Sequence, residues 1–435
     1  MKKGKVKQDY QKKYLNNYMN LFIIISLFSI VIFFVYCFFS QGCNLNIFFF
    51  HDKIDTGMDF FNSMIYLKGR HPYTQYTTIY PPLANLFFWI LTHLVPRDEK
   101  ALWPDTFEGS VAIRTSYIDL RVHQSTLLIF ILFICILSIT FIIVMSLYFN
   151  NAYYGFLCGV VLTFSYGWIF ALERGNIITL SLIFLLVFLK FYKSDNPKIK
   201  ELALIALAIS AGFKIYPALF GILLLYEKNI KDIVKAIIYG IIFFFSPLFL
   251  FDGLAGIKYF VAALTDFANK DTPLASVSRY NISGIVKSIC IQFGTLFEFD
   301  VSWVIYYDFK FITIFVIISI VIGLFVIKQN WKRILLIGIL LIMAQASLAY
   351  TLIFLIPAFV FFVLEEKISS KTRGYFILLT LIFIPIPLMG SISFYNLNYI
   401  TILGQDALLI MVLKLLVDIY VGLYSKLKEL RKGKN

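Results

Sequence analysis

LFIIISLFSIVIFFVYCFF, residues 21–39, is an apolar stretch that contains no charged side chain. An α-helix needs about 20 predominantly apolar residues to cross the hydrocarbon core of a bilayer. Similar runs recur along the 435-residue chain, which is 60% hydrophobic and only 15% charged. Soluble domains contain roughly a quarter charged residues, and disordered chains have low hydrophobicity, so the composition excludes both classes. Residues 21–39 therefore predict the first span of an all-α polytopic membrane protein.

The net charge of +14 follows the predicted membrane topology. Lysine and arginine gather in short segments between the apolar runs, at residues 2–13, 193–200, 228–235, 328–333, 367–373 and 426–434. Such segments stay on the cytoplasmic side of a membrane. The basicity therefore indicates loop orientation, and we expect no nucleic-acid partner.

Placing these basic segments inside gives about twelve spans with both termini cytoplasmic, in an integral protein of the plasma or inner membrane. The predicted spans are 21–40, 125–148, 153–172, 176–192, 200–213, 216–227, 234–251, 309–327, 334–349, 350–364, 374–390 and 405–424. Residues 1–20 and 425–435 form basic cytoplasmic tails. Two long loops, 41–124 and 253–308, lie outside. We find no internal repeat, so residues 1–435 are predicted to form a single integral membrane domain.

The first outer loop is the more informative of the two. Its segments Asp59–Leu67 and Leu83–Leu94 have the pattern of juxtamembrane helices. It also holds all four histidines of the chain. None of them has the spacing of metal ligands on one helix face, so we expect neither a metal nor another cofactor.

Two acidic residues of this loop are candidates for catalysis. Asp55 and Asp59 are four residues apart, so on a helix they share one face. A carboxylate at the membrane surface is suited to act as a general base toward a hydroxyl group. The alternative is structural, because Asp59 is also placed to stabilise a helix N-terminus.

Two basic residues lie at the outer ends of predicted spans. Arg174 and Lys214 are placed to hold a lipid phosphate, Arg174 by bidentate hydrogen bonds and Lys214 as a point charge. Each also has a simpler interpretation. Arg174 can pair locally with Glu173, and Lys214 can extend along apolar surface to the membrane interface.

Five short motifs occur in a fixed order along the chain. They read Asp59-Phe60-Phe61, Gly69-Arg70-His71-Pro72-Tyr73, Tyr80-Pro81-Pro82-Leu83, Gly175-Asn176 and Lys214-Ile215-Tyr216-Pro217. Together with the topology, this order resembles the polyprenol-phosphate-mannose-dependent mannosyltransferases of the glycosyltransferase C superfamily. Weaker similarity continues through Asn281-Ile282-Ser283-Gly284 and Leu348-Ala349-Tyr350. Family members often carry a histidine in this last segment, where the present chain has Tyr350.

The resemblance implies a glycosyltransferase C-like helix bundle and a defined reaction. A sugar, mannose or another hexose or pentose, would move with inversion from a polyprenyl-phosphate donor to a glycolipid or glycan acceptor at the outer face. Asp59, or Asp55 one turn away, would be the general base. Lys214 and Arg174 would bind the donor phosphate, and the substrate pocket would include five further residues: Tyr80, Asn176, Tyr216, His71 and Tyr350.

Two other functions remain open from the sequence. A lipid-linked oligosaccharide flippase or transporter also suits about twelve spans, but it would place charges inside a central bundle. A polymerase of O-antigen type uses the same lipids, but we would expect arginines to dominate its large outer loops. The sequence does not identify the sugar, the linkage or the acceptor.

Overall fold

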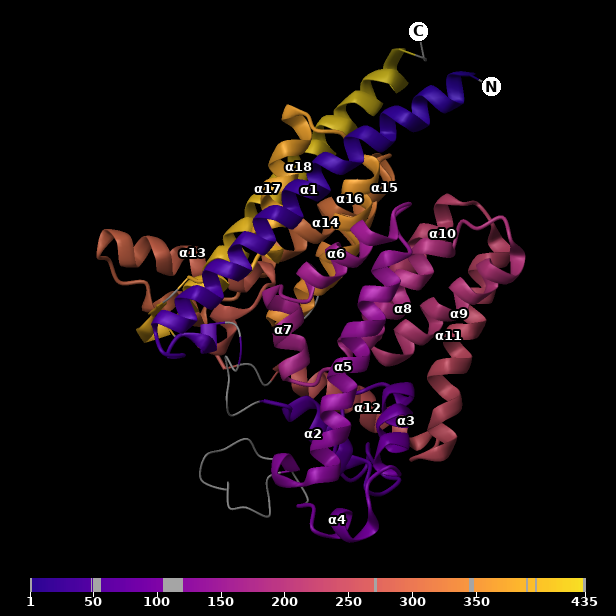
Figure 1. Ribbon diagram of the computed structural model, residues 1–435, viewed down its shortest axis with the longest axis vertical. Helices are drawn as coiled ribbons and strands as arrows, with labels where there is room; N and C mark the ends of the chain where they lie inside the picture. The colour runs from indigo at the N-terminus through magenta and orange to yellow at the C-terminus, as the bar shows by residue number, and fades with distance from the viewer. Residues whose placement is uncertain are drawn as a thin grey trace. The chain divides into compact units, whose positions relative to one another are not determined.

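A computed structural model describes residues 2–47, 49, 56–104, 120–269, 272–343, 348–388, 390–395 and 397–432. The protein is all-α, with 77% of its residues in helices (Figure 1). It divides into two compact units. The terminal unit comprises Met1–Phe48, Val160–Gly167 and Asp271–Asn435, and the central unit comprises Phe49–Gly159 and Trp168–Lys270. The prediction of a single domain stays a prediction.

The central unit contains the predicted first outer loop from residue 49 onward and the helices that follow it. Its α-helices are α2 (Met58–Tyr66), α3 (Pro82–Thr92), α4 (Arg97–Ala101), α5 (Gln124–Ser146), α8 (Ile178–Phe191), α9 (Pro197–Phe213), α10 (Leu223–Tyr226), α11 (Ile230–Phe245) and α12 (Ala255–Asn269). Short 3₁₀ helices are η3 (Leu120–Val122), η4 (Tyr216–Ile222) and η5 (Ser246–Leu250). Helices α6 (Ala152–Leu162) and α7 (Tyr166–Glu173) extend into both units and are bent by 65° at the break between them.

Helices α8, α9 and α11 pack side by side in the central unit (Figure 1). The hydroxyls of Ser181 on α8 and Ser210 on α9 each donate to the other residue's carbonyl oxygen, at 2.9 and 2.7 Å. Such hydrogen bonds join helices whose surfaces are otherwise apolar. Helix α3 approaches α9 at Gly212, where a Cβ atom would lie 2.7 Å from the Leu83 side chain. The outer-loop helices therefore rest directly on the helical framework.

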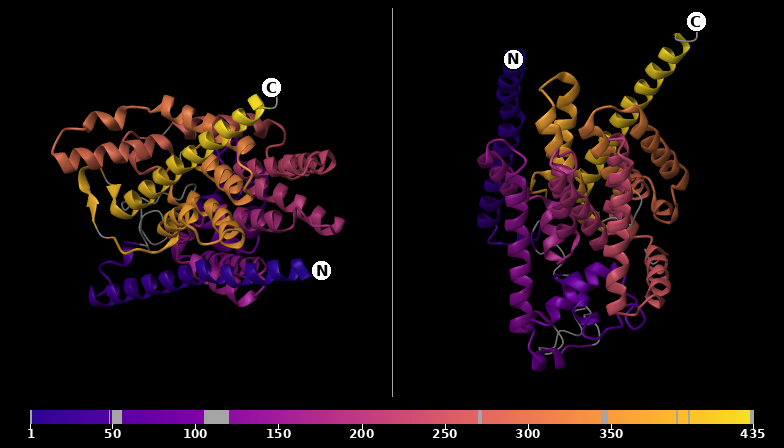
Figure 2. Two further views of the ribbon diagram at one scale, coloured as in Figure 1. Left: turned by 90° about the horizontal axis from the view of Figure 1, so that it is seen from above. Right: turned by 90° about the vertical axis from the view of Figure 1, so that its right-hand side faces the viewer.

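The terminal unit contains the first helix and the C-terminal third of the chain. Its α-helices are α1 (Lys2–Phe39), α13 (Ile282–Phe297), α14 (Lys310–Val326), α15 (Asn330–Met343), α16 (Ile356–Glu365), α17 (Ser370–Phe383) and α18 (Tyr399–Lys432). Figure 2 shows α18 as the long yellow helix that leads to the C-terminus. The 3₁₀ helices are η1 (Leu45–Ile47), η6 (Ala275–Ser278), η7 (Ser302–Tyr306), η8 (Ala349–Leu355) and η9 (Ser393–Tyr395). Strands β1 (Ser391–Ile392) and β2 (Leu397–Asn398) form one short antiparallel pair.

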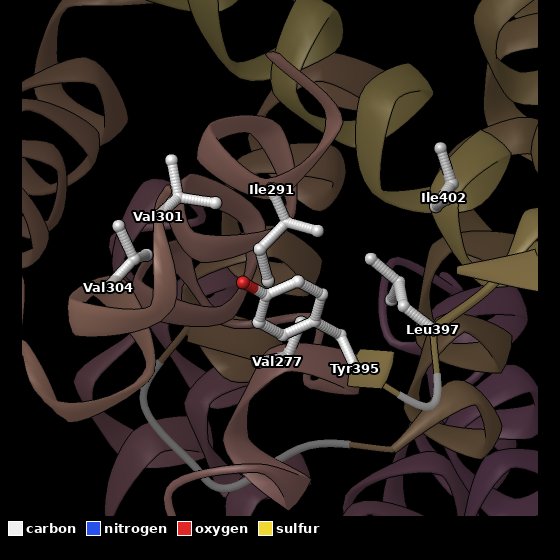
Figure 3. Close-up of a cluster of buried hydrophobic side chains, with 7 residues drawn as sticks. All are labelled: Val277, Ile291, Val301, Val304, Tyr395, Leu397 and Ile402. Atoms are coloured by element: carbon white, nitrogen blue, oxygen red, sulfur yellow. The ribbon is translucent and has the colours of Figure 1, made fainter. Parts of the chain in front are cut away.

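A compact apolar cluster lies within the terminal unit (Figure 3). Tyr395 of η9 points into it, and valine and isoleucine side chains from η6, α13, η7 and α18 surround the ring. The amide of Gln405 supports the same region by donating to the carbonyl oxygens of Val277 and Arg279, both at 2.8 Å. Residues 272–308 of the predicted second outer loop thus fold as helical turns and α13, and α13 packs on α18.

The structure supports a membrane protein, although by length it identifies fewer spans than the sequence predicts. Within the described residues, four segments are long and apolar enough to cross a membrane: Tyr18–Phe39, Gln124–Ser146, Ile230–Leu250 and Tyr399–Arg431. The bent pair α6–α7 would make a fifth. The other predicted spans overlap helices of fewer than 18 residues, too short to be counted as spans by length. Helix α8, for example, has 14 residues and is about 21 Å long, against a hydrocarbon core of about 30 Å.

Helix α5 shows the lipid-facing pattern most clearly. It is apolar throughout, and one side remains exposed, with Leu128, Ile136 and Ile139 between 56% and 58% accessible. A continuous exposed apolar face marks a surface that another apolar phase covers. A helix of 23 residues is long enough for that phase to be a bilayer.

Candidate functional site

Helix α2 presents two faces with different chemistry. Phe60, Phe61, Met64 and Ile65 are fully buried, and the two phenylalanines contact aromatic rings of α3 and α5. The opposite face carries Met58, Asp59, Asn62 and Tyr66, spaced three and four residues apart, and it lines a cavity. The sequence prediction of a helix at Asp59–Leu67 is therefore confirmed to within one residue at each end, and its place at the membrane surface stays a prediction.

The cavity has a volume of about 330 Å³ and belongs entirely to the central unit. Its other walls come from residues 76–80, from Arg174, and from Ala263, Asp266 and Phe267 of α12. The rings of Tyr66 and Tyr76 stack at 5.1 Å. Burial, and then the negative charge of Asp59, raise the pKa of the Tyr66 phenol, so its hydroxyl stays protonated and can donate.

Asp59 is held by three side-chain hydrogen bonds. Arg174 donates from Nε to Oδ2 at 3.2 Å and from Nη2 to Oδ1 at 3.1 Å. The amide of Asn176 donates to Oδ2 at 2.7 Å. The two ionic side chains are 19% and 15% exposed. A bidentate guanidinium pair fixes both the position and the plane of a carboxylate, so Asp59 has a defined orientation at the cavity wall.

The backbone brings these residues together. The N–H groups of Gly57 and Asp59 donate to the carbonyl oxygens of Glu173 and Arg174, at 2.5 and 3.0 Å. The first N–H groups of a helix have no partner within the helix, so the 173–174 segment satisfies donors of α2. The Oδ1 atom of Asn176 also accepts from the N–H of Ile178, at 3.0 Å. One asparagine therefore links the start of α8 to the carboxylate.

Two glycines make this close approach possible. Gly57 and Gly175 both have positive φ angles, 74° and 65°. A Cβ atom on Gly175 would lie 2.4 Å from the Cβ of Phe60, and one on Gly57 would lie 2.4 Å from the Phe61 ring. A side chain at Gly175 would therefore separate the Asp59 segment from the Arg174 segment, and one at Gly57 would displace the Phe61 ring.

Lys214 lies close to the Asp59–Arg174 ion pair but does not line the cavity. Its ammonium is positioned over the ring of Tyr80, 4.2 Å from the centroid, and Tyr80 itself lines the cavity. Burial lowers the pKa of Lys214 to about 8, with Arg174 adding to this effect and Asp59 opposing it. A cation over an aromatic ring is stabilised by the ring's electrons.

The structure brings together Asp59, Arg174, Asn176, Tyr80 and Lys214. Three other predicted pocket residues do not line the cavity: Tyr216, Tyr350 and His71. Tyr216 is half-buried in η4, and Tyr350 lies in η8 of the terminal unit. Asp55 lies outside the described residues.

His71 has a different role in the central unit. Its side chain is 65% exposed, and Nδ1 lies 3.1 Å from Oδ1 of Asp252. The same carboxylate accepts from the N–H of Tyr73 at 2.9 Å and from the hydroxyl of Thr74 at 2.5 Å. Asp252 therefore anchors the segment that leads to the cavity wall.

Three residues at or near the cavity were not singled out in the sequence. Asp252 resembles an ordinary turn residue, since Gly253 follows it with a φ of 62°. Tyr76 and Asp266 are single polar residues in segments without a recognisable motif. The three-residue spacing from Asp59 to Asn62 was a usable signal for the wall formed by α2.

Comparison of the chain with protein-family models, with curated proteins and with solved structures finds no match.

Proposed function

We propose that this protein is a membrane glycosyltransferase that moves a sugar from a polyprenyl-phosphate donor to a hydroxyl group of a glycolipid or glycan acceptor. The supporting observation is the placement of Asp59. The aspartate at the position of the family's base lies at the wall of a cavity of about 330 Å³, held by Arg174 and Asn176. A concave site with a few convergent polar groups is typical of small-molecule binding.

The hydrogen bonds of Asp59 leave an acceptor position. An ionised carboxylate has about four lone-pair sites. Oδ2 accepts two hydrogen bonds and Oδ1 accepts one from the described residues. The remaining site on Oδ1 is available to an acceptor hydroxyl in the cavity.

The reaction then proceeds as a single displacement. Asp59 takes the proton of the acceptor hydroxyl, and that oxygen attacks the anomeric carbon. The bond from this carbon to the phosphate oxygen breaks, and the polyprenyl phosphate leaves with the electron pair. Attack opposite the leaving group inverts the anomeric configuration.

Negative charge grows on the phosphate as the bond breaks, and fixed cations favour that change. Arg174 lines the cavity and supplies a permanent charge. Lys214 adds a second charge behind the Tyr80 ring. With a pKa of about 8 it is mostly protonated at neutral pH. In this proposal Arg174 also positions Asp59, so that the carboxylate is oriented before substrate binds.

The same proposal includes the finer points of topology and substrate. The chain crosses the plasma or inner membrane about twelve times with both termini in the cytoplasm. The cavity then faces outward, and the sugar is mannose or a related hexose or pentose. Short helices such as α8 complete this bundle without each being long enough to span alone.

The experiment is a transfer assay in membranes with a panel of radiolabelled polyprenyl-phosphate sugars. We expect one donor to label an endogenous acceptor with the wild-type protein, and Asp59→Asn to abolish labelling. Asp98→Asn is the matched control, because Asp98 lies in the first turn of α4 in the same outer loop and does not line the cavity.

Equal labelling by wild type and Asp59→Asn would contradict the proposal. No labelling from any donor, with movement of a labelled lipid across the bilayer instead, would favour a flippase. Extension of preformed lipid-linked repeats without use of a monosaccharide donor would favour a polymerase.

A further inference from the structure

A second cavity lies between α1 and α17, wholly within the terminal unit. It has a volume of about 560 Å³, and aliphatic and aromatic side chains form almost all of its lining. Two of its few polar groups are Arg373 and Thr380, both on α17. We call this cavity the α1–α17 groove.

The two helices are joined at two levels along the groove. At one level the Tyr18 hydroxyl lies 2.9 Å from the Thr372 hydroxyl, and the Tyr18 ring packs on Phe376 at 4.5 Å. At the other, the Ser29 hydroxyl donates to the carbonyl oxygen of Pro385 at 2.5 Å. Eleven residues of α1 separate Tyr18 from Ser29, which is about 17 Å. That length matches one leaflet of a bilayer whose hydrocarbon core is about 30 Å thick.

A cation lies at the end of the groove near Tyr18. Arg373 is exposed, and its guanidinium makes no hydrogen bond or ion pair with the described residues. It is in the first turns of α17, where the helix dipole is positive and a cation is unfavourable. Helix stability therefore does not explain this arginine, whereas an anion at the same place interacts favourably with both the dipole and the guanidinium.

A buried hydroxyl gives a second, independent indication of a ligand. Thr380 lines the groove, is only 6% exposed, and its Oγ1 has no hydrogen-bond partner within the described structure. A buried hydroxyl left unsatisfied has a desolvation cost that no hydrogen bond offsets. A pure hydrocarbon chain would leave this cost in place, but a lipid with oxygen atoms near its chains can remove it.

We propose that the α1–α17 groove binds an anionic glycerophospholipid, with its phosphate at Arg373 and one acyl chain between the two helices. The apolar lining accepts the chain, the arginine accepts the charged phosphate, and the ester oxygens supply a partner for Thr380. Under the predicted topology, residues 367–373 face the cytoplasm. The lipid therefore comes from the cytoplasmic leaflet, which is rich in anionic lipids. This inference does not depend on the proposed transfer reaction.

The test is a lipid titration of the purified full-length protein in detergent, followed by native mass spectrometry. The probes are dioleoyl phosphatidylglycerol, dioleoyl phosphatidylcholine and a polyprenyl phosphate. We expect wild type to bind phosphatidylglycerol at least tenfold more tightly than phosphatidylcholine. Arg373→Gln should remove this preference, because a hydrogen bond to a charged group contributes about 1.5–3 kcal/mol, or roughly 10–100-fold.

The matched control is Lys328→Gln, which removes an exposed cation of another predicted cytoplasmic loop in the same unit and should leave the preference intact. Ile377→Trp should weaken binding of both glycerophospholipids, since Ile377 lines the groove and is 50% exposed, so a larger side chain fills the space without disturbing the core. Thr380→Val, which keeps the shape of the side chain, should weaken phosphatidylglycerol binding by several-fold.

Three results would overturn the inference. The first is equal affinity of wild type for the two glycerophospholipids. The second is an unchanged preference in Arg373→Gln, or an equal loss in Lys328→Gln, which would show a general effect of surface charge. The third is tight binding of the polyprenyl phosphate alone, which would assign the groove to a different lipid.

Discussion

The cavity beside Asp59 and the α1–α17 groove differ in how their polar groups are satisfied. In the central unit, Asp59 is bound by Arg174 and Asn176, and the opposite wall carries tyrosines and Asp266. In the α1–α17 groove, Arg373 and the Thr380 hydroxyl have no partners among the described residues. A carboxylate held in one orientation is prepared for chemistry on a substrate. An unpaired cation beside an apolar channel is suited to binding a lipid.

Among variants that leave Asp59 in place, the largest effect is expected from breaking its ion pair with Arg174. Arg174→Ala removes two hydrogen bonds from Asp59 and should lower transfer activity roughly 100-fold, since bonds to charged groups contribute about 1.5–3 kcal/mol. Arg174→Lys keeps the charge but not the bidentate geometry, and we expect roughly a tenfold loss. The assay is the initial rate of sugar transfer. If the lysine variant is as active as wild type, orientation of Asp59 is not the role of Arg174.

A comparison of two glycines separates the effect of close packing on stability from the effect of backbone conformation. Gly175→Ala places a Cβ atom 2.4 Å from Phe60 at a φ of 65°, and should destabilise the protein by roughly 2–5 kcal/mol. Gly42 in the terminal unit has a φ of 80° with nothing within 4 Å of a Cβ atom. Gly42→Ala should therefore cost only about 1–2 kcal/mol. Thermal unfolding in detergent compares the two, and equal shifts would contradict the packing argument.

Two asparagines separate helix capping from the link to Asp59. Asn176 and Asn196 both accept hydrogen bonds from backbone N–H groups at the start of a helix, but only Asn176 also donates to Asp59. Each alanine variant should lose about 1 kcal/mol of stability. Only Asn176→Ala should also lose roughly tenfold in transfer rate. A similar rate loss in Asn196→Ala would mean that local stability alone limits activity.

The smallest effect is a shift in pH dependence. Burial lowers the pKa of Lys214 to about 8 from an ordinary value of 10.5, so the charged form is lost as the pH rises through about 8. Transfer should fall in that range, and Lys214→Arg should keep its activity to higher pH because arginine stays protonated. The free energy of unfolding changes with pH in the opposite direction to transfer activity. The unfolded chain binds the proton more tightly, so the contribution of Lys214 to stability rises between about pH 8 and 10.5. Identical pH profiles of transfer for wild type and Lys214→Arg would exclude Lys214 from the reaction.

The sequence predicted the helices better than the contacts between them. Apolar length and Pro81-Pro82 were sufficient to predict α3, which begins at Pro82, because these signals are local. The predicted span at 153–172 corresponds to two helices bent by 65°, which pass as a span only when they are taken together. Composition alone does not reveal a bend of this kind.

The ion pair between Asp59 and Arg174 could not be predicted from the sequence. Asp59 and Arg174 are 115 residues apart, and the sequence suggested only a local partner, Glu173, for the arginine. Their meeting depends on tertiary packing around Gly57 and Gly175, for which a single sequence has no periodic signal. Asp59 itself was found because its place after the first span and its motif are readable in the chain.

The most direct test of the account is a comparison of donor binding and single-turnover rate between purified wild-type protein and Asp59→Asn. The donor is the polyprenyl-phosphate sugar that the transfer assay identifies. We expect donor affinity to stay within about threefold and the rate of sugar transfer to fall by roughly 10²–10⁴, the usual contribution of a general base. A variant that binds the donor and transfers its sugar at the wild-type rate would contradict the assignment of Asp59 as the base.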